Sequence, residues 1–195
     1  MMRSKAALAS PSGAAAHTPA QTRIIEAALT LFAEQGIGGT SLQMIADAIG
    51  VTKAAVYHQY NTKDEIILAV AETVLAGLEA AVVAAEAERS RARARELLVG
   101  RMIDLAVETR GMASVLQQDP VMLRFLQAHA PFRRVMERLN RVLMGRASDP
   151  RARVQAATVA AAIAGAVIHP LVLALDDDAL RAQLVKQVRK LLPIR

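Results

Sequence analysis

Residues 42–60, LQMIADAIGVTKAAVYHQY, combine three features that a tight turn between two short helices needs. Ala46 is small, so a second helix can approach it closely, and Gly50 tolerates the positive φ of a sharp turn. Val56 then supplies an apolar anchor that faces back toward the core. The segment therefore predicts a helix-turn-helix, and a generic helical hairpin with similar apolar spacing is the alternative.

The rest of the sequence also favours helices. Hydrophobic residues make up 53% of the chain but aromatic residues only 3%, and Ala and Leu dominate the apolar set. These are strong helix formers, whereas strands favour β-branched and aromatic residues. We expect an all-α protein whose first helix begins at Thr18-Pro19 and stops at Gly36. Longer helices are predicted at about 63–88, 94–109, 120–128, 131–146, 151–174 and 177–192.

Several classes of chemistry find no support in the sequence. The chain has no cysteine, which excludes disulfides, thiolate nucleophiles and cysteine-based metal sites. Its four histidines lack a metal-binding spacing, and no glycine-rich phosphate loop or nucleophile–base pair is recognisable. The acidic run 176–178 is better placed to cap the last helix than to hold calcium. We therefore expect no enzyme activity, no metal and no cofactor.

The second helix of the predicted motif has an unusual outward face. Lys53 can donate to guanine, Thr52 to a base or a phosphate, and Tyr57 and His58 to phosphates. Ala54 is small and permits close approach of the helix to a groove. Together with the neighbouring caps and the start of the next helix, the predicted DNA-binding residues are Thr40, Ser41, Thr52, Lys53, Ala54, Tyr57, His58 and Lys63.

The net charge of +6 is not concentrated at this motif. Residues 1–18 contribute +2, residues 19–70 contribute −2 from three basic and five acidic side chains, and the remaining +6 lies after residue 70. We therefore expect DNA to be bound by locally placed groups and not by a broadly basic domain.

Residues from about 20 to 70 resemble the DNA-binding domain of the tetracycline-repressor (TetR) family of bacterial regulators. The resemblance rests on Thr40-Ser41-Leu42, Ile45-Ala46, Gly50-Val51-Thr52-Lys53, Val56-Tyr57, Tyr60 and Lys63-Asp64-Glu65, and on Ile25, Ala28, Leu31, Phe32 and Gly36 before them. Many family members carry glycine in place of Ala54 or Ala55, and phenylalanine in place of Tyr60.

The resemblance implies a division into a flexible tail (1–18), a helix-turn-helix domain (19–66) and a ligand-binding and dimerisation domain (67–195). It also implies a cytoplasmic homodimer that binds a palindromic operator, most simply as a repressor, and that a small-molecule effector releases. The last two long helices would form the dimer interface.

Residues 154–175 contain no charged side chain, which is typical of a helix buried on nearly all sides. A membrane span is the alternative, but alanine, glycine, Gln155, His169 and Pro170 make it a poor one. We therefore expect no membrane association. The small residues here would allow a second copy to pack closely. The predicted dimer-interface residues are Ala157, Ala161, Ala164, Gly165, Ile168, Leu184 and Val188.

Apolar residues of the middle helices are the candidates for an effector pocket. Methionines among them are adaptable and suit a loosely selective site, although they equally suit an ordinary core. The expected effector is lipophilic, and Arg110 or Arg124 could meet an acidic head group if it carries one, although nothing in the sequence singles these two residues out. The predicted pocket residues are Met102, Leu105, Leu116, Met122, Phe125, Leu126, Phe132 and Met136.

Overall fold

The computed structural model describes residues 17–145 and 149–191, and every regular element in these ranges is a helix. Most of the predicted tail, residues 1–16, lies outside the described residues. The helices are α1 (Pro19–Gly39), α2 (Leu42–Ile49), α3 (Lys53–Gln59), α4 (Lys63–Glu86), α5 (Arg91–Glu108), α6 (Arg110–Gln118), α7 (Pro120–Ala128), α8 (Ala130–Met144), α9 (Pro150–Ala166), the 3-10 turn η1 (Pro170–Val172) and α10 (Asp177–Leu191). The all-α expectation is therefore confirmed.

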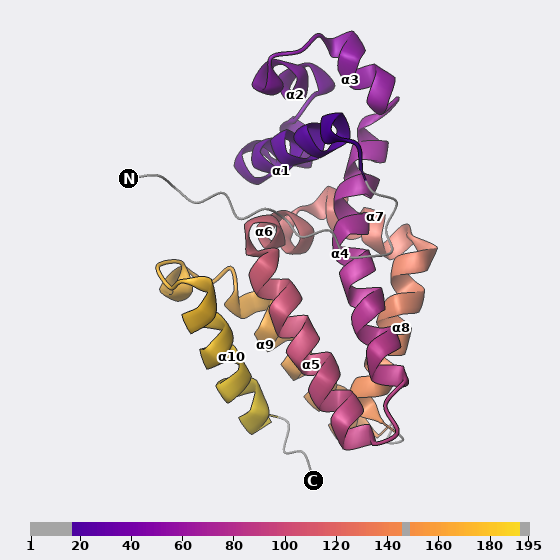
Figure 1. The fold of residues 1–195 in the computed structure, drawn as a ribbon, viewed down its shortest axis with the longest axis vertical. Helices are drawn as coiled ribbons and strands as arrows, with labels where there is room; N and C mark the ends of the chain where they lie inside the picture. The colour runs from indigo at the N-terminus through magenta and orange to yellow at the C-terminus, as the bar shows by residue number, and fades with distance from the viewer. Residues whose placement is uncertain (1–16, 146–148, 192–195) are drawn as a thin grey trace.

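Helices α1, α2 and α3 form one end of the molecule, and α5 to α10 form the other (Figure 1). Helix α4 belongs to both ends. Its first half packs in an apolar cluster with α1 to α3, and its second half packs with α5, α8, α9 and α10. The predicted boundary at residue 66 thus falls inside one continuous helix, so the two ends are joined by a rigid element.

Side-chain caps explain where several helices begin. The hydroxyl of Thr18 accepts from the amide of Gln21, whose side chain in turn accepts from the amide of Thr18, and Pro19 fills the first helical position. Ser41, Thr52 and Thr62 cap α2, α3 and α4 in the same way. Caps of this kind contribute about 1 kcal/mol each and fix the start of short helices.

Two sequence predictions about helices were wrong. No helix was predicted between residues 109 and 120, yet α6 occupies Arg110–Gln118, with Gly111 in its first turn. The predicted helix 151–174 ends at Ala166, because His169 precedes Pro170 and adopts an extended conformation (φ −73°, ψ 134°). The segment considered as a membrane span is therefore not one helix.

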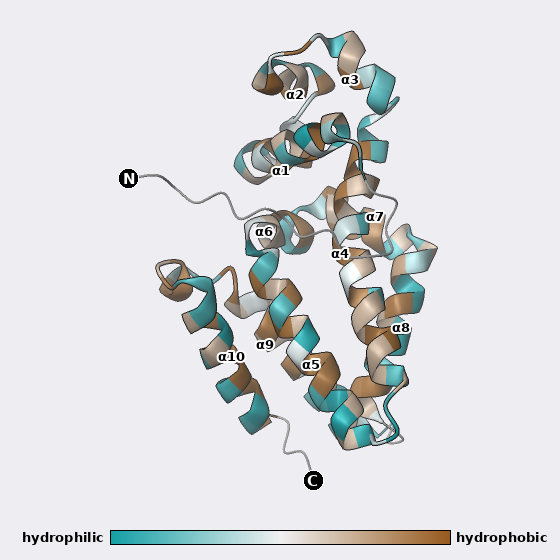
Figure 2. Ribbon diagram, in the orientation of Figure 1, coloured by the Kyte–Doolittle hydropathy of each residue, from teal (hydrophilic) through white to brown (hydrophobic). Residues whose placement is uncertain are grey.

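Within the described residues, α4 alone is long and apolar enough to cross a membrane by length and composition. It is the central helix of the fold and packs against α1, α5 and α8. Figure 2 shows that α4 is largely apolar, whereas hydrophilic residues gather on α10 and on the end of α5. Its apolar composition is accounted for by its place between the two clusters.

Candidate nucleic-acid interface and internal cavity

The turn between α2 and α3 has the geometry that the sequence predicts. Ala46 and Val56 are fully buried and face each other's helices across the turn. Gly50 ends α2 in the left-handed conformation (φ 68°, ψ 37°), and its amide donates to the carbonyls of Ala46 and Asp47. An L residue with a side chain would be strained there, so the glycine is required by the turn.

The outer face of α3 presents donors and small side chains to solvent. Lys53, Ala54, Tyr57 and His58 are all exposed. The ammonium of Lys53 lies 5.5 Å from the centre of the Tyr57 ring, within range of a cation–π interaction that holds the two side chains together on this face. Thr52 caps α3 by accepting from the amide of Ala55, which leaves its hydroxyl hydrogen available to an outside acceptor.

Two predicted DNA-binding residues, Thr40 and Lys63, form hydrogen bonds within the protein. Thr40 is only 2% exposed, and its hydroxyl donates to the carbonyl of Gly36, so its side chain does not reach the surface. The ammonium of Lys63 donates to the carbonyls of Ile37 (2.8 Å) and Thr40 (2.9 Å). These two bonds tie Lys63 to the last turn of α1 and use two of the three N–H groups of its ammonium. Sequence could not predict this, because the pairing joins α1 to α4.

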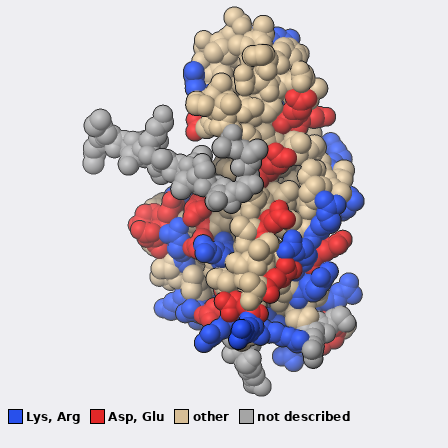
Figure 3. Space-filling model, turned by 45° about the vertical axis from the view of Figure 1, so that its right-hand side comes forward, with Lys and Arg blue, Asp and Glu red and all other residues tan. Residues whose placement is uncertain are grey.

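Few charged side chains surround this end of the molecule. In Figure 3 the end that carries α1 to α3 is largely uncharged on the visible face, while Lys, Arg, Asp and Glu are dense on the larger domain. The guanidinium of Arg23 already donates a hydrogen bond to the carbonyl of Ile49. A nucleic-acid interface at this end would therefore depend on specific donors on α3 and not on an extended basic surface.

The last turn of α1, after the kink at Gly36, is also held by the junction of α6 and α7. One carboxylate oxygen of Asp119, at the junction of α6 and α7, accepts from the amide of Ile37 at 2.8 Å. Its other oxygen accepts from the amides of Val121 and Met122 and so caps α7. Asp119 thus fixes the position of α7 and of the α1 turn at once, a role that sequence reasoning missed.

The side chain of Tyr60 closes the core beneath α3. Tyr60 is 7% exposed, and its hydroxyl is buried with no hydrogen-bond partner among the described residues. Burial, and secondarily the negative charge of Glu72, raise the pKa of Tyr60 above its ordinary value. The hydroxyl is therefore a cost to the fold, which agrees with the phenylalanine found here in the related family.

A cavity of about 290 Å³ lies between α4, α5, α6, α7, α8 and α9. Six of the predicted pocket residues line it: Met102, Leu105, Leu116, Leu126, Phe132 and Met136. The other two do not, because Met122 is fully buried in the N-terminal cluster and Phe125 stacks on His129 (ring centres 5.9 Å apart).

Sequence reasoning missed the walls that α4 and α9 contribute. The lining residues from α4 and from α9 with its C-cap are Ala71, Val74, Leu78, Ala160, Ile163, Ala164 and Val167. Two polar residues that were also missed are Thr109, between α5 and α6, and Gln117 on α6. The helical spacing of Ala71, Val74 and Leu78 marks one face of α4 and was the available signal. Arg110, considered for an acidic ligand, instead pairs with Asp177 at 3.1 Å.

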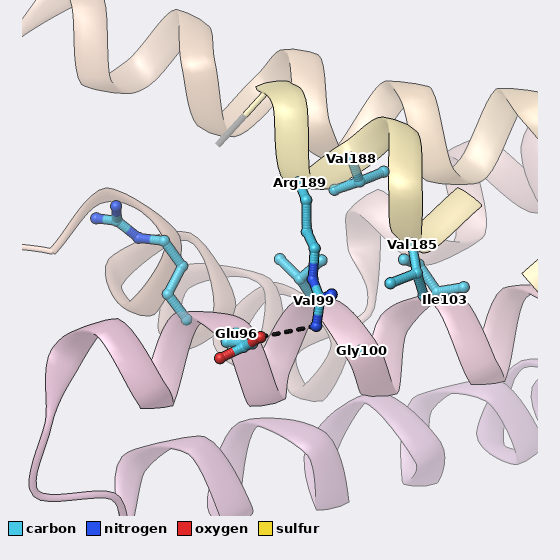
Figure 4. Close-up of a pocket in the computed structure, with 8 residues that line it drawn as sticks. Glu96, Val99, Gly100, Ile103, Val185, Val188 and Arg189 are labelled. Carbon is cyan, nitrogen blue, oxygen red and sulfur yellow. Dashed lines mark hydrogen bonds and ion pairs between the residues drawn. The ribbon is translucent and has the colours of Figure 1, made fainter. Parts of the chain in front are cut away.

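A second hollow of about 50 Å³ lies between α5 and α10 (Figure 4). It is walled by Val99, Ile103 and Val185, and the ion pair between Arg189 and Glu96 (2.9 Å) spans it. One water takes up about 30 Å³ in the liquid, so this hollow has room for water but not for an organic ligand.

The predicted dimer-interface residues fall into two groups. Ala157 and Ala161 are exposed on α9, and Ala164, Gly165 and Ile168 are half-buried. Leu184 and Val188 are instead buried in the chain's own core, where α10 packs on α5, so they are not on the surface. Their apolar stripe fits an internal helix as well as an interface, which is why the sequence alone misassigned them. Exposed apolar residues near α9 include Val154 (66%) and Leu171 (86%).

Comparison with known proteins identifies the helix-turn-helix. Residues 24–70 match the model of the bacterial regulatory proteins of the tetR family. The negative transcriptional regulator IcaR of the biofilm operon icaADBC of Staphylococcus epidermidis is 43% identical over 44 residues, 23% of this chain and 24% of the relative. The transcriptional repressor KstR2 of Rhodococcus jostii is 36% identical over 47 residues, 24% of this chain and 23% of the relative.

The likeness in fold extends over nearly the whole chain. The ketosteroid transcriptional regulator KstR2 of Mycobacterium tuberculosis superposes with a TM-score of 0.69 and 15% identity, over 89% of this chain and 94% of that structure. The matched sequence, by contrast, spans about a quarter of the curated relatives. The fold and the α2–α3 turn define an all-α helix-turn-helix protein. In residues 24–70 the chain is similar to the tetR family of bacterial regulatory proteins, and its fold is similar to that of a solved regulator, KstR2.

Proposed function

We propose that this chain is a transcriptional repressor of the bacterial cytoplasm, which binds a palindromic DNA operator as a homodimer and is released by a small lipophilic effector. The observation that carries the proposal is the exposed face of α3, where Lys53 and Tyr57 stand together on a helix-turn-helix of the tetR family. The helix presents donors and small side chains, as a helix in the major groove requires.

Repression is supported by the relatives. IcaR is named as a negative regulator and KstR2 as a repressor. Dimerisation is supported by the exposed small residues Ala157 and Ala161 on α9, beside the exposed Val154. A two-fold axis past this face would pair α9 with its copy and would present two α3 helices to a symmetric site.

Release is supported by the position of the cavity. Leu116 and Gln117 of α6 and Leu126 of α7 line it, and Asp119 lies between them at the helix junction. A ligand that displaces α6 or α7 would move the carboxylate of Asp119, which accepts from the amide of Ile37. The position of α1 relative to α2 and α3 would then change. This gives the effector a physical route to the DNA-binding residues.

The test is a selection of random duplex DNA on the purified full-length protein, in parallel with Lys53→Ala and Lys186→Ala. Lys186 is exposed on α10 and serves as the matched control. We expect the wild type and Lys186→Ala to enrich one palindrome and Lys53→Ala to lose it. Failure of the wild type to enrich any sequence at low and moderate salt would contradict the proposal and favour a helical protein, soluble or membrane-associated, that does not read DNA.

A further inference from the structure

The cavity of about 290 Å³ has an almost entirely apolar lining. Of the residues that line it, only Thr109 and Gln117 are polar, and none carries a charge. Methionines 102 and 136, on α5 and α8, can adapt to the shape of an occupant. The lining therefore suits a molecule whose surface is mostly hydrocarbon.

The two cations considered for an acidic head group, Arg110 and Arg124, lie outside this lining. Arg110 follows Thr109, but its guanidinium pairs with Asp177 (3.1 Å) and donates to the carbonyl of Leu175 (3.0 Å). Arg124 is exposed on α7 and does not line the cavity. A carboxylate placed inside would be buried without a counter-charge, and that is strongly unfavourable.

The two polar side chains offer acceptors more than donors. The hydroxyl of Thr109 already donates to the carbonyl of Leu105 (2.7 Å), so its oxygen is left to accept. The side-chain nitrogen of Gln117 donates to the carbonyl of Ala164 (3.1 Å). Because that carbonyl can only accept, the nitrogen must face it, and the Gln117 oxygen is left for another donor. A ligand is therefore best matched if it brings a hydrogen-bond donor.

We propose that this cavity takes an uncharged lipophilic alcohol, whose hydroxyl donates to Gln117 or Thr109 and whose apolar body fills the rest, and that it excludes the corresponding carboxylate. The inference rests on the proposed function, since it names the chemical class of the effector. It replaces the acidic head group for which Arg110 and Arg124 were considered.

The test is calorimetric titration of the full-length protein, without DNA, at pH 8. The probes are 1-octanol, octanoate and methyl octyl ether, whose oxygen can accept but not donate. We expect 1-octanol to bind at least about tenfold more tightly than octanoate and severalfold more tightly than the ether. Equal or tighter binding of octanoate would overturn the proposal, as would failure of 1-octanol to bind. Equal binding of the ether would overturn the role of the hydroxyl donor.

Two variants locate the hydrogen bond. Gln117→Leu should reduce the preference for 1-octanol over the ether, whereas Gln118→Leu, at the exposed neighbouring position on α6, should keep it. An unchanged preference in Gln117→Leu would remove Gln117 from the proposed contact. The comparison of probes on the wild type stands even if Gln117→Leu folds poorly. Operator binding is measured separately, so binding of 1-octanol without release of operator would contradict the proposed function and not the ligand class.

Discussion

The carboxylate of Asp119 accepts a hydrogen bond of 2.8 Å from the backbone amide of Ile37, 82 residues earlier in the chain. Ile37 follows Gly36, whose positive φ of 73° breaks the helical path of α1 and turns this amide out of the helix. The bond therefore fastens the junction of α6 and α7, beside the cavity, to the base of the helix-turn-helix.

Asp119→Ala removes this fastening, and we expect it to reduce the effect of a ligand on operator affinity at least about tenfold. The change also removes the cap of α7, which costs about 1 kcal/mol of stability. Asp149→Ala is the control, because Asp149 caps α9 by accepting from Ala152 at 2.7 Å, and α9 packs mainly on α10, α8 and α5. Fluorescence anisotropy of labelled operator, with and without ligand, measures the ligand effect in both variants. A full response in Asp119→Ala would rule out this route.

Lys53→Ala and Tyr57→Ala remove the paired side chains on the outer face of α3. Each should weaken operator binding by about 1–3 kcal/mol without changing the melting temperature, because both side chains are exposed. Anisotropy at a fixed salt concentration gives the affinity, with Lys186→Ala as the control. If either variant binds the operator as tightly as the wild type, that residue does not contribute to DNA recognition by α3.

Tyr60→Phe removes a buried hydroxyl that has no partner in the described part of the chain. We expect the free energy of unfolding in urea to rise by about 1 kcal/mol. The pKa of Tyr60 is raised in the folded state, so the wild type loses stability as pH climbs above 10, where the unfolded chain ionises first. The advantage of Tyr60→Phe should therefore grow above pH 10. Tyr57→Phe, at an exposed position, should show neither effect, and a less stable Tyr60→Phe would mean that the hydroxyl has a partner.

Gly77→Ala should narrow the cavity. A Cβ on Gly77 would lie 2.6 Å from Cδ1 of Leu105, so Leu105 must move, and Leu105 lines the cavity. We expect severalfold weaker binding of 1-octanol by calorimetry. In Gly100→Ala a Cβ would meet nothing within 4 Å, so that control should gain up to about 1 kcal/mol of helix stability and bind normally. Unchanged ligand affinity in Gly77→Ala would show that Leu105 moves elsewhere.

Ala161→Arg places a long charged side chain on the exposed face of α9. If this face pairs with its copy, sedimentation should show a shift from dimer to monomer, and operator affinity should fall with it. Ala80→Arg, at an exposed position of α4, is the control and should stay dimeric. A dimeric Ala161→Arg would move the interface away from this part of α9.

The parts of the fold that depend on neighbours in sequence were predictable. Ala46, Gly50 and Val56 specify the α2–α3 turn through their own size and φ preference. The parts that depend on distant segments were not. Lys63 was predicted to contact a phosphate, but two of its three ammonium N–H groups donate to carbonyls in the last turn of α1. Val188 has the pattern of an interface residue but packs in the core with α5. Nothing in the sequence indicated the role of Asp119, because its partner Ile37 becomes a neighbour only after folding.

The weak charge of the DNA-binding end has a consequence for how such a protein searches a chromosome. Within residues 19–70, Arg23 and Lys63 are tied to backbone carbonyls, and Lys53 remains on the outer face. A surface that neutralises few phosphates displaces few condensed counterions, so its hold on arbitrary sequence is weak and varies little with ionic strength. If this end binds DNA as proposed, the protein is expected to spend little time sliding along arbitrary sequence and to reach its target mainly by collisions from solution.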